Sequence, residues 1–253
     1  MGSGFDVSSA FFGSHIYTRF SPALLAPLLE AHSRNEVEGP ALVQLLTAAW
    51  DTGVQPLHLP HGLVLVLGDV HAGSHTPSMV GKVLKWRAGP GAEELWTRTA
   101  ATNARVEAAL GRLGSLDLCE SDNSRGNVNI PRLELARLPP TKWPLFIEAE
   151  QKSGTKTARE MAALSAFVEA QGAFQEVRRF LQELGACADV PIEPTEQTAL
   201  LDATAALPGV LMAGVPGAGG FDAVFALLLD ESCVGSVREL WQGSEQVTCH
   251  SFL

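Results

Sequence analysis

The sequence lacks the marks of an extracellular, a zinc-binding or a nucleic-acid-binding protein. Its cysteines show no CxxC motif and no ligand-like spacing, so free thiols in a reducing compartment and no protein-bound metal are expected. Charged residues make up only 18% of the chain, the formal net charge is −10, and no basic stripe stands out. Nucleic acid is therefore not an expected partner. The cysteines are Cys119, Cys187, Cys233 and Cys249.

Long apolar runs are also missing. The longest, within 62–70 and 223–230, have the length of strands, so no membrane-spanning helix and no membrane partner are expected. The N-terminus shows no basic segment followed by an apolar one, as a secretory signal would. The C-terminal HSFL lacks the basic middle residue of a peroxisomal tripeptide. The expected location is the cytoplasm, with the peroxisome as the alternative.

The hydrophobic content of 46% is ample for a packed core. Apolar and small residues predict a short buried helix over 5–12, and the run over 62–70 predicts a central strand. Helical patterns follow, with Pro77 in a first turn and a glycine stop at 114. The expected helices after the central strand span 77–87, 91–114, 158–188 and 198–207.

Two parts of the chain show little regular pattern. Residues 119–157 are polar, interrupted by prolines and aperiodic, which predicts a long loop or a disordered insert. The tail over 231–253 contains one weak helical stretch, SVRELW, and is expected to be weakly structured. No internal repeat is visible, and the chain is treated as one region over 1–253.

A glycine-rich run, GVPGAGG at 214–220, lies between two apolar runs. It has neither the lysine of a phosphate-binding P-loop nor a following helix, as a dinucleotide fold would require. Residues 211–229 are therefore predicted to form two antiparallel strands joined by this loop. Two interpretations of the glycines stay open: a tight hairpin, or a loop whose backbone approaches a ligand.

Three stretches gain meaning when they are taken together and in order. They are GSGFDVSSAFFGS at 2–14, LVLGDVHAGSHTPSMVGKVLKW at 65–86, and VPIEPTEQTALLDATAALPGVLMAGVPGAGGFDAVFAL at 190–227. With them the chain resembles the phosphomevalonate kinases of the GHMP small-molecule kinase family, over roughly residues 1–90 and 158–230. The resemblance implies an α+β fold: the ferredoxin-like C-terminal half of a GHMP kinase, with an antiparallel sheet and covering helices.

The same resemblance implies the activity and the site. The enzyme would use ATP and Mg²⁺ to convert 5-phosphomevalonate to its diphosphate in the mevalonate pathway. Asp6 resembles the catalytic aspartate, and its alternative is a helix cap after a glycine turn. For Ser74, Thr76 and Lys82 the alternative is a capped helix with a surface lysine. The resemblance assigns substrate binding to five residues, Ser3, Gly4, Ser74, Thr76 and Lys82. It assigns the nucleotide and phosphate loop to Gly217, Ala218, Gly219 and Gly220.

Family members also carry a glycine-serine loop that wraps the ATP phosphates at a helix N-terminus, ahead of the GSGFD stretch. No such loop is found in this sequence. The chain is therefore expected to be a C-terminal portion of the enzyme with little or no kinase activity by itself. The alternative function is that of an inactive fragment that keeps weak substrate binding or an association role, including self-association through apolar surface.

Overall fold

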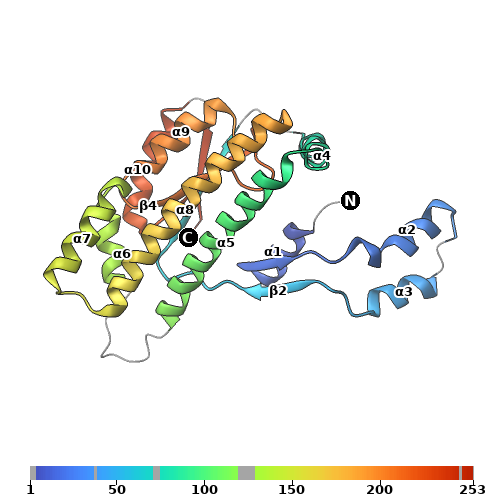
Figure 1. Cartoon of the computed structure of the whole chain (residues 1–253), viewed down its shortest axis with the longest axis horizontal. Coiled ribbons are helices and arrows are strands. Elements are labelled where there is room, and N and C mark those ends of the chain that lie inside the picture. Colours follow the sequence, from blue (N-terminus) through green and yellow to red (C-terminus); the bar gives the residue numbers. More distant parts are fainter. Residues whose placement is uncertain (1–3, 37–38, 71–74, 119–128, 245–246, 253) are drawn as a thin grey trace. The chain divides into compact units, whose positions relative to one another are not determined.

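The computed structural model describes residues 4–36, 39–70, 75–118, 129–244 and 247–252 (Figure 1). It divides into two compact units, Met1–His58 and Leu59–Leu253, and each is described by itself. In the described residues no helix is long and apolar enough to cross a membrane.

The N-terminal unit is a two-stranded antiparallel sheet with short helices. His15 of β1 lies opposite Pro56 of β2. The helix expected over 5–12 is confirmed, but its burial is wrong, because Val7 and Phe11 are 70% and 81% exposed. Two strands of four residues offer too little apolar surface to cover such a helix. The elements are α1 (Phe5–Phe12), β1 (His15–Thr18), the 3-10 helix η1 (Pro22–Leu24), α2 (Ala26–Ser33), α3 (Gly39–Thr47) and β2 (Gly53–Pro56).

The C-terminal unit contains a four-stranded sheet in the order β4-β5-β3-β6, with every neighbouring pair antiparallel. Helices separate β3 from β4 and β5 from β6, while β4 and β5 form a hairpin. This is the βαββαβ order of ferredoxin-like folds, so the predicted fold class is confirmed. The strands are β3 (Val64–Val70), β4 (Val210–Gly214), β5 (Ala223–Leu228) and β6 (Val247–Phe252).

Strand β3 is the central strand that its apolar run predicts. Val66 is fully buried, and the strand pairs with β5 on one side and β6 on the other. Gly68 lets the ring of Trp241 approach the sheet, because a Cβ there would lie 2.9 Å from the ring. Trp241, in α10 (Val234–Gln242), donates from Nε1 to Thr204 Oγ1 at 2.9 Å. The sheet, α10 and the helix that carries Thr204 thus share one core.

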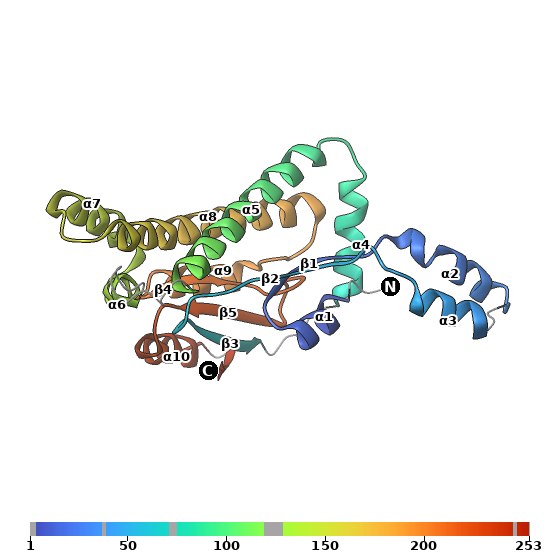
Figure 2. The same cartoon turned by 90° about the horizontal axis from the view of Figure 1, so that it is seen from below.

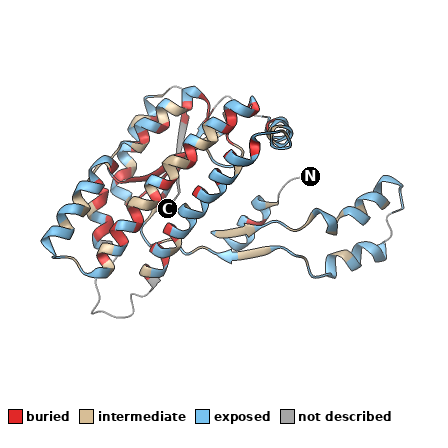
Figure 3. Ribbon diagram, viewed as in Figure 1, coloured by how far each residue is buried: buried red, intermediate tan, exposed pale blue. Residues whose placement is uncertain are grey.

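Long helices lie on one side of strands β3 and β5, where α5 and α8 run side by side (Figure 2). Buried residues gather along α8, and others lie on α5 (Figure 3). The expected glycine stop at 114 is wrong, because α5 continues to Leu118. Leu110 and Leu113 of α5 are buried, and this packing outweighs the low helix propensity of glycine. The helices are α4 (Thr76–Arg87), α5 (Ala92–Leu118), α8 (Ala158–Ala188) and α9 (Thr195–Ala205).

Ion pairs join α5 to α8 at a regular interval. The arginines recur every seventh residue along α5, and the glutamates recur every seventh residue along α8 in the opposite direction. Such a pattern is typical of an antiparallel helix pair whose flanking charges select the register. The three pairs are Arg98–Glu183, Arg105–Glu176 and Arg112–Glu169.

We expect the middle pair to contribute modestly and in a salt-dependent way. The side chains of Arg105 and Glu176 are 50% and 34% exposed, so the pair is worth about 0.2–1 kcal/mol. Arg105→Glu should lower the free energy of unfolding in urea, since it places two carboxylates together, and adding Glu176→Arg should recover most of that loss. Equal losses in the single and double variants at low salt would contradict this.

The predicted insert over 119–157 is wrong for residues 129–153, whereas residues 154–157 do form a loop. Residues 129–153 form α6 (Asn129–Ala136), the 3-10 helix η2 (Pro140–Lys142) and α7 (Trp143–Ser153). Trp143 is fully buried and donates from Nε1 to Leu135 O at 3.1 Å and Leu138 O at 3.0 Å. Short proline-bounded helices give no long periodicity, and they are stabilised here by packing. Residues 119–128 lie outside the described residues.

The expected weakly structured tail is also wrong. After the 3-10 helix η3 (Glu231–Cys233), α10 buries Val237 and Trp241 completely. Strand β6 then pairs with β3 along the sheet edge, with Val247 opposite Val70. The tail therefore supplies an edge strand and part of the core, although its own sequence shows only one short apolar pattern.

Candidate functional site

The glycine loop connects β4 to β5, as predicted. Met212 pairs with Leu227 and Gly214 pairs with Phe225, so the strands on both sides are antiparallel. The loop has two halves. Gly217 is exposed, whereas Gly219 and Gly220 are buried. All three glycines have positive φ angles, of 65°, 75° and 88°, a conformation that other residues rarely adopt.

Close backbone contact explains the buried half of the loop. The Gly220 N–H donates to Ile192 O at 2.8 Å. A Cβ on Gly219 would lie only 2.1 Å from the same oxygen, so no other residue fits there. At Gly217, by contrast, nothing lies within 4 Å of the position of a Cβ. The first half of the loop thus borders open space that a ligand can enter.

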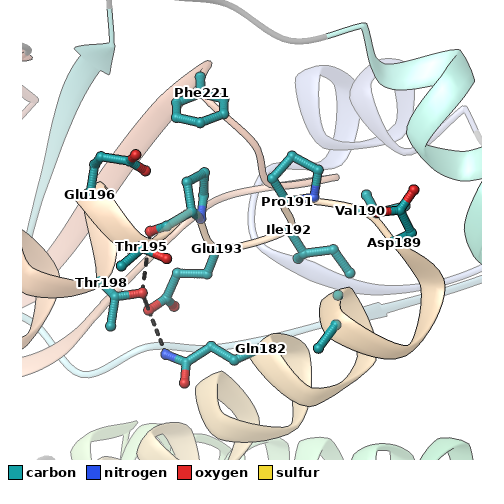
Figure 4. A pocket seen from close by; sticks show the side chains of 13 residues that line it. Gln182, Asp189, Val190, Pro191, Ile192, Glu193, Thr195, Glu196, Thr198 and Phe221 are labelled. Atoms are coloured by element: carbon teal, nitrogen blue, oxygen red, sulfur yellow. Dashed lines mark hydrogen bonds between the residues drawn. The ribbon is translucent and has the colours of Figure 1, made fainter.

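Ile192 belongs to the segment that joins α8 to α9, and this segment lines a cavity of about 610 Å³ (Figure 4). Figure 4 shows the Glu193 side chain between Gln182 and Thr198, each of which donates a hydrogen bond to it. The walls combine carboxylate and hydroxyl groups with apolar side chains, among them Pro191 and Phe221. The loop and this cavity therefore share one supporting segment.

A buried ion pair holds that segment to α8. Arg178 donates to Glu193 twice, from Nη2 to Oε1 at 2.6 Å and from Nε to Oε2 at 3.0 Å. The Arg178 side chain is 3% exposed and that of Glu193 is 0% exposed. Burial alone would lower the pKa of Arg178, but the hydrogen bonds and charges of Glu193 and Asp202 outweigh it, so the net shift is upward. The Arg178 guanidinium therefore stays charged at physiological pH.

A second hollow, of about 270 Å³, lies at the beginning of α4. His75, Ser78 and Lys82 line it, since their spacing puts them on one face of the helix. The Lys82 Nζ donates to the backbone O and to Oδ2 of Asp189, at 2.9 Å each. A helix N-terminus and an ammonium group together favour an anion. Here Asp189 already supplies one negative charge.

The pKa of Asp189 tests this contact. The hydrogen bond and charge of Lys82 lower that pKa below its ordinary value of 3.8. The stabilising contribution is therefore complete above that value and is lost as the pH falls through the lowered pKa. A ¹³C NMR titration of the carboxyl group should give a higher midpoint in Lys82→Met. Lys85→Met, on the same helix, should leave it unchanged, and equal midpoints in all three proteins would refute the contact.

The remaining predicted site residues lie in the N-terminal unit, at the first position of α4, or outside the described residues. Gly4 precedes α1 with a φ of 81° and takes the N-cap position. Asp6 is therefore in the first turn and is not the cap of the alternative interpretation. It is exposed, and no ion pair of its carboxylate is found among the described residues. Thr76 opens α4 and is exposed. Ser3 and Ser74 lie outside the described residues.

Sequence reasoning missed Arg178, Asp189 and Glu193, which connect the glycine loop to two helices. One signal was present: Arg178 follows Val177 on the buried face of α8, where a charge needs a buried partner. No group of three His, Cys, Asp or Glu side chains able to hold a metal occurs within the described parts of the chain.

A family profile described as GHMP kinases C terminal matches residues 162–242, which include Arg178, Glu193 and the glycine loop. This part of the chain is similar to the C-terminal domain of GHMP kinases. Curated relatives extend this match. A peroxisomal phosphomevalonate kinase of Arabidopsis thaliana is 38% identical over 92% of this chain and 44% of its own length. A phosphomevalonate kinase of Candida albicans is 30% identical over 94% of this chain and 48% of its own length. The chain thus spans less than half of these relatives.

Solved structures share the fold of this chain. The Streptococcus pneumoniae phosphomevalonate kinase in complex with phosphomevalonate and AMPPNP aligns with a TM-score of 0.61 at 14% identity, over 99% of this chain and 56% of that one. A Lin0012 protein from Listeria innocua aligns with a TM-score of 0.58 at 16% identity, over 100% and 55%. At these identities the likeness concerns the fold alone.

Proposed function

We propose that this chain is the C-terminal part of a phosphomevalonate kinase of the mevalonate pathway, which transfers the γ-phosphoryl group of ATP to the phosphate of 5-phosphomevalonate. The observation that carries the proposal is the identity of 30–38% with phosphomevalonate kinases over more than 90% of the chain. The bacterial kinase of the same fold binds phosphomevalonate and AMPPNP, an analogue of ATP. The described glycine loop and the beginning of α4 supply chemistry that suits such ligands.

In the proposed reaction a phosphate oxygen of the acceptor attacks the γ-phosphorus of ATP. The bond to the oxygen that bridges the β- and γ-phosphates breaks, and ADP leaves with that electron pair. The acceptor phosphate is largely ionised near pH 7, so the reaction needs alignment and charge neutralisation more than a strong base. Mg²⁺ enters with ATP as part of the substrate and neutralises phosphate charge.

The proposed roles follow the groups available. The backbone at Gly217 borders open space, so the loop from Gly217 to Gly220, with Ala218, can lie beside phosphate oxygens. Thr76 and Lys82, at the beginning of α4, would contact the anionic substrate. Asp6 would orient the acceptor by its charge. Ser3, Gly4 and Ser74 complete the proposed substrate contacts.

The alternative is an inactive fragment that keeps at most weak substrate binding or an association role. Within the N-terminal unit, exposed Val7 and Phe11 lie four residues apart on one face of α1 and offer an apolar surface suited to self-association. Small molecules remain the proposed partners in either case. The proposed location is the cytoplasm or the peroxisome, the latter being part of the name of the Arabidopsis thaliana relative.

A coupled ADP-release assay with phosphomevalonate and Mg²⁺·ATP tests the proposal. We expect little turnover by the chain alone and turnover once it is joined to the remainder of the Arabidopsis thaliana relative. In that joined protein Asp6→Asn should lower kcat by about 10²–10³, the usual loss for one preorganised polar group. Glu30→Gln, an exposed control in the same unit, should change kcat less than about twofold. No turnover by the joined protein would favour the inactive fragment.

A further inference from the structure

The short segment Asp189–Glu193 contacts three parts of the proposed site. Asp189 holds Lys82 of α4, and Ile192 O accepts the Gly220 N–H of the glycine loop. Glu193, next to Ile192 in the chain, holds Arg178 of α8. The conformation of this segment therefore determines where both the lysine and the loop lie.

Glu193 is the most firmly held residue of the segment. Its carboxylate accepts four hydrogen bonds, two from Arg178, one from Gln182 Nε2 at 2.7 Å and one from Thr198 Oγ1 at 3.0 Å. Charged hydrogen bonds of this kind are roughly twice as strong as neutral ones. At the other end Asp189 is exposed and has only Lys82 as an ion-pair partner among the described residues. The buried end, and not the exposed one, anchors the segment.

From this geometry we infer that Arg178 and Glu193 are positioning residues for phosphoryl transfer. Their buried pair fixes the Ile192 carbonyl, and that carbonyl fixes Gly219 and Gly220. Their side chains are 3% and 0% exposed, so we assign them a role through the backbone of the segment and not through direct contact with substrate. The inference rests on the proposed function for the assignment of the loop to the nucleotide. The mechanical link from Glu193 to Gly220 stands on the described contacts alone.

Glu193→Gln is the variant that separates these claims. Glutamine keeps the shape of the side chain but removes its charge and presents an NH₂ group to donors, so the segment should loosen without a cavity being formed. Asp202→Asn is the matched control. Asp202 also accepts a hydrogen bond from Arg178, at 2.9 Å, but it belongs to α9 and not to the segment. A general weakening of Arg178 would affect both variants.

Amide hydrogen exchange, followed by NMR in the full chain, is the measurement that decides the inference. In Glu193→Gln the Gly220 amide should exchange at least about tenfold faster, while the amide of Val66 in β3 should keep its protection. In Asp202→Asn both amides should keep their rates. Faster exchange of Val66 and Gly220 together, or unchanged exchange of Gly220, would overturn the inference.

Binding of AMPPNP with Mg²⁺, followed through the Gly219 and Gly220 resonances, adds a functional readout. Glu193→Gln should weaken this binding at least about tenfold, and Asp202→Asn should not, since only the former displaces the loop. If the unchanged chain, joined to the remainder of the Arabidopsis thaliana relative, does not bind AMPPNP, the proposed function fails. The exchange result at Gly220 then still decides whether Glu193 positions the loop. Wild-type affinity in Glu193→Gln would show that positioning has no functional effect.

Discussion

Gly219→Ala is expected to displace the glycine loop, whereas the same substitution at Gly217 leaves it in place. Both residues have positive φ angles, so alanine costs about 1–2 kcal/mol in backbone strain at either position. Only at Gly219 does the new Cβ overlap the Ile192 carbonyl, at 2.1 Å. We expect that overlap to add about 1–3 kcal/mol, the usual range for overpacking. Urea unfolding of the two variants measures the difference.

The two variants control for each other, because the chemical change, glycine to alanine, is the same at both positions. Affinity for AMPPNP should fall for Gly219→Ala and change less for Gly217→Ala, since the loop in the latter keeps its hydrogen bond to Ile192. Equal losses of stability would mean that backbone strain alone explains the glycines. A larger loss of affinity at Gly217 would mean that its open side receives the ligand so closely that a methyl group blocks it.

The fold was predictable where one element carries its own pattern. The β4–β5 hairpin follows from two apolar runs around glycines, and β3 follows from a run that is buried between two other strands. Helix α8 begins at a capping box, in which Thr157 Oγ1 accepts from the Glu160 N–H at 3.2 Å. Such signals are local, so the sequence alone suffices to find them.

Elements stabilised by distant partners were missed. Helices α6 and α7 are each only two or three turns long, and prolines interrupt their pattern, yet Trp143 is fully buried. Strand β6 exists because β3 offers it an unpaired edge. The end of α5 was placed too early for a related reason, because packing against α8 outweighs the cost of its glycines. No window of sequence around these residues contains the partner that stabilises them.

Sequence patterns pointed to the glycines and Lys82 of the proposed site, but not to the residues that hold them. Glu193 lies in VPIEPT, where a single acidic residue among prolines looks like part of an exposed loop. Its burial depends on Arg178, which is fifteen residues away in the chain and on another element. The seven-residue spacing of arginines on α5 and glutamates on α8 was visible, but only the helix pairing gives it meaning. Pairings of this kind need the three-dimensional structure.

Arg178→Met should strongly destabilise the C-terminal unit. It leaves the Glu193 carboxylate, whose side chain is 0% exposed, without its charged partner. Breaking a buried pair in this way costs about 3–5 kcal/mol, because a buried charge is left uncompensated. Urea unfolding followed by circular dichroism should show the loss as a lower midpoint with an unchanged slope.

The double variant Arg178→Met with Glu193→Met separates lost pairing from lost packing. Removing both charges leaves apolar groups in the same space, so much of the stability should return, and replacement of a buried pair is often neutral. The double variant should nevertheless keep the fast exchange at Gly220, since methionine cannot accept the hydrogen bonds that hold the segment. Stability regained together with slow exchange at Gly220 would show that packing alone places the loop. Stability regained with fast exchange would show that the ion pair determines the position of the loop more than the stability of the fold.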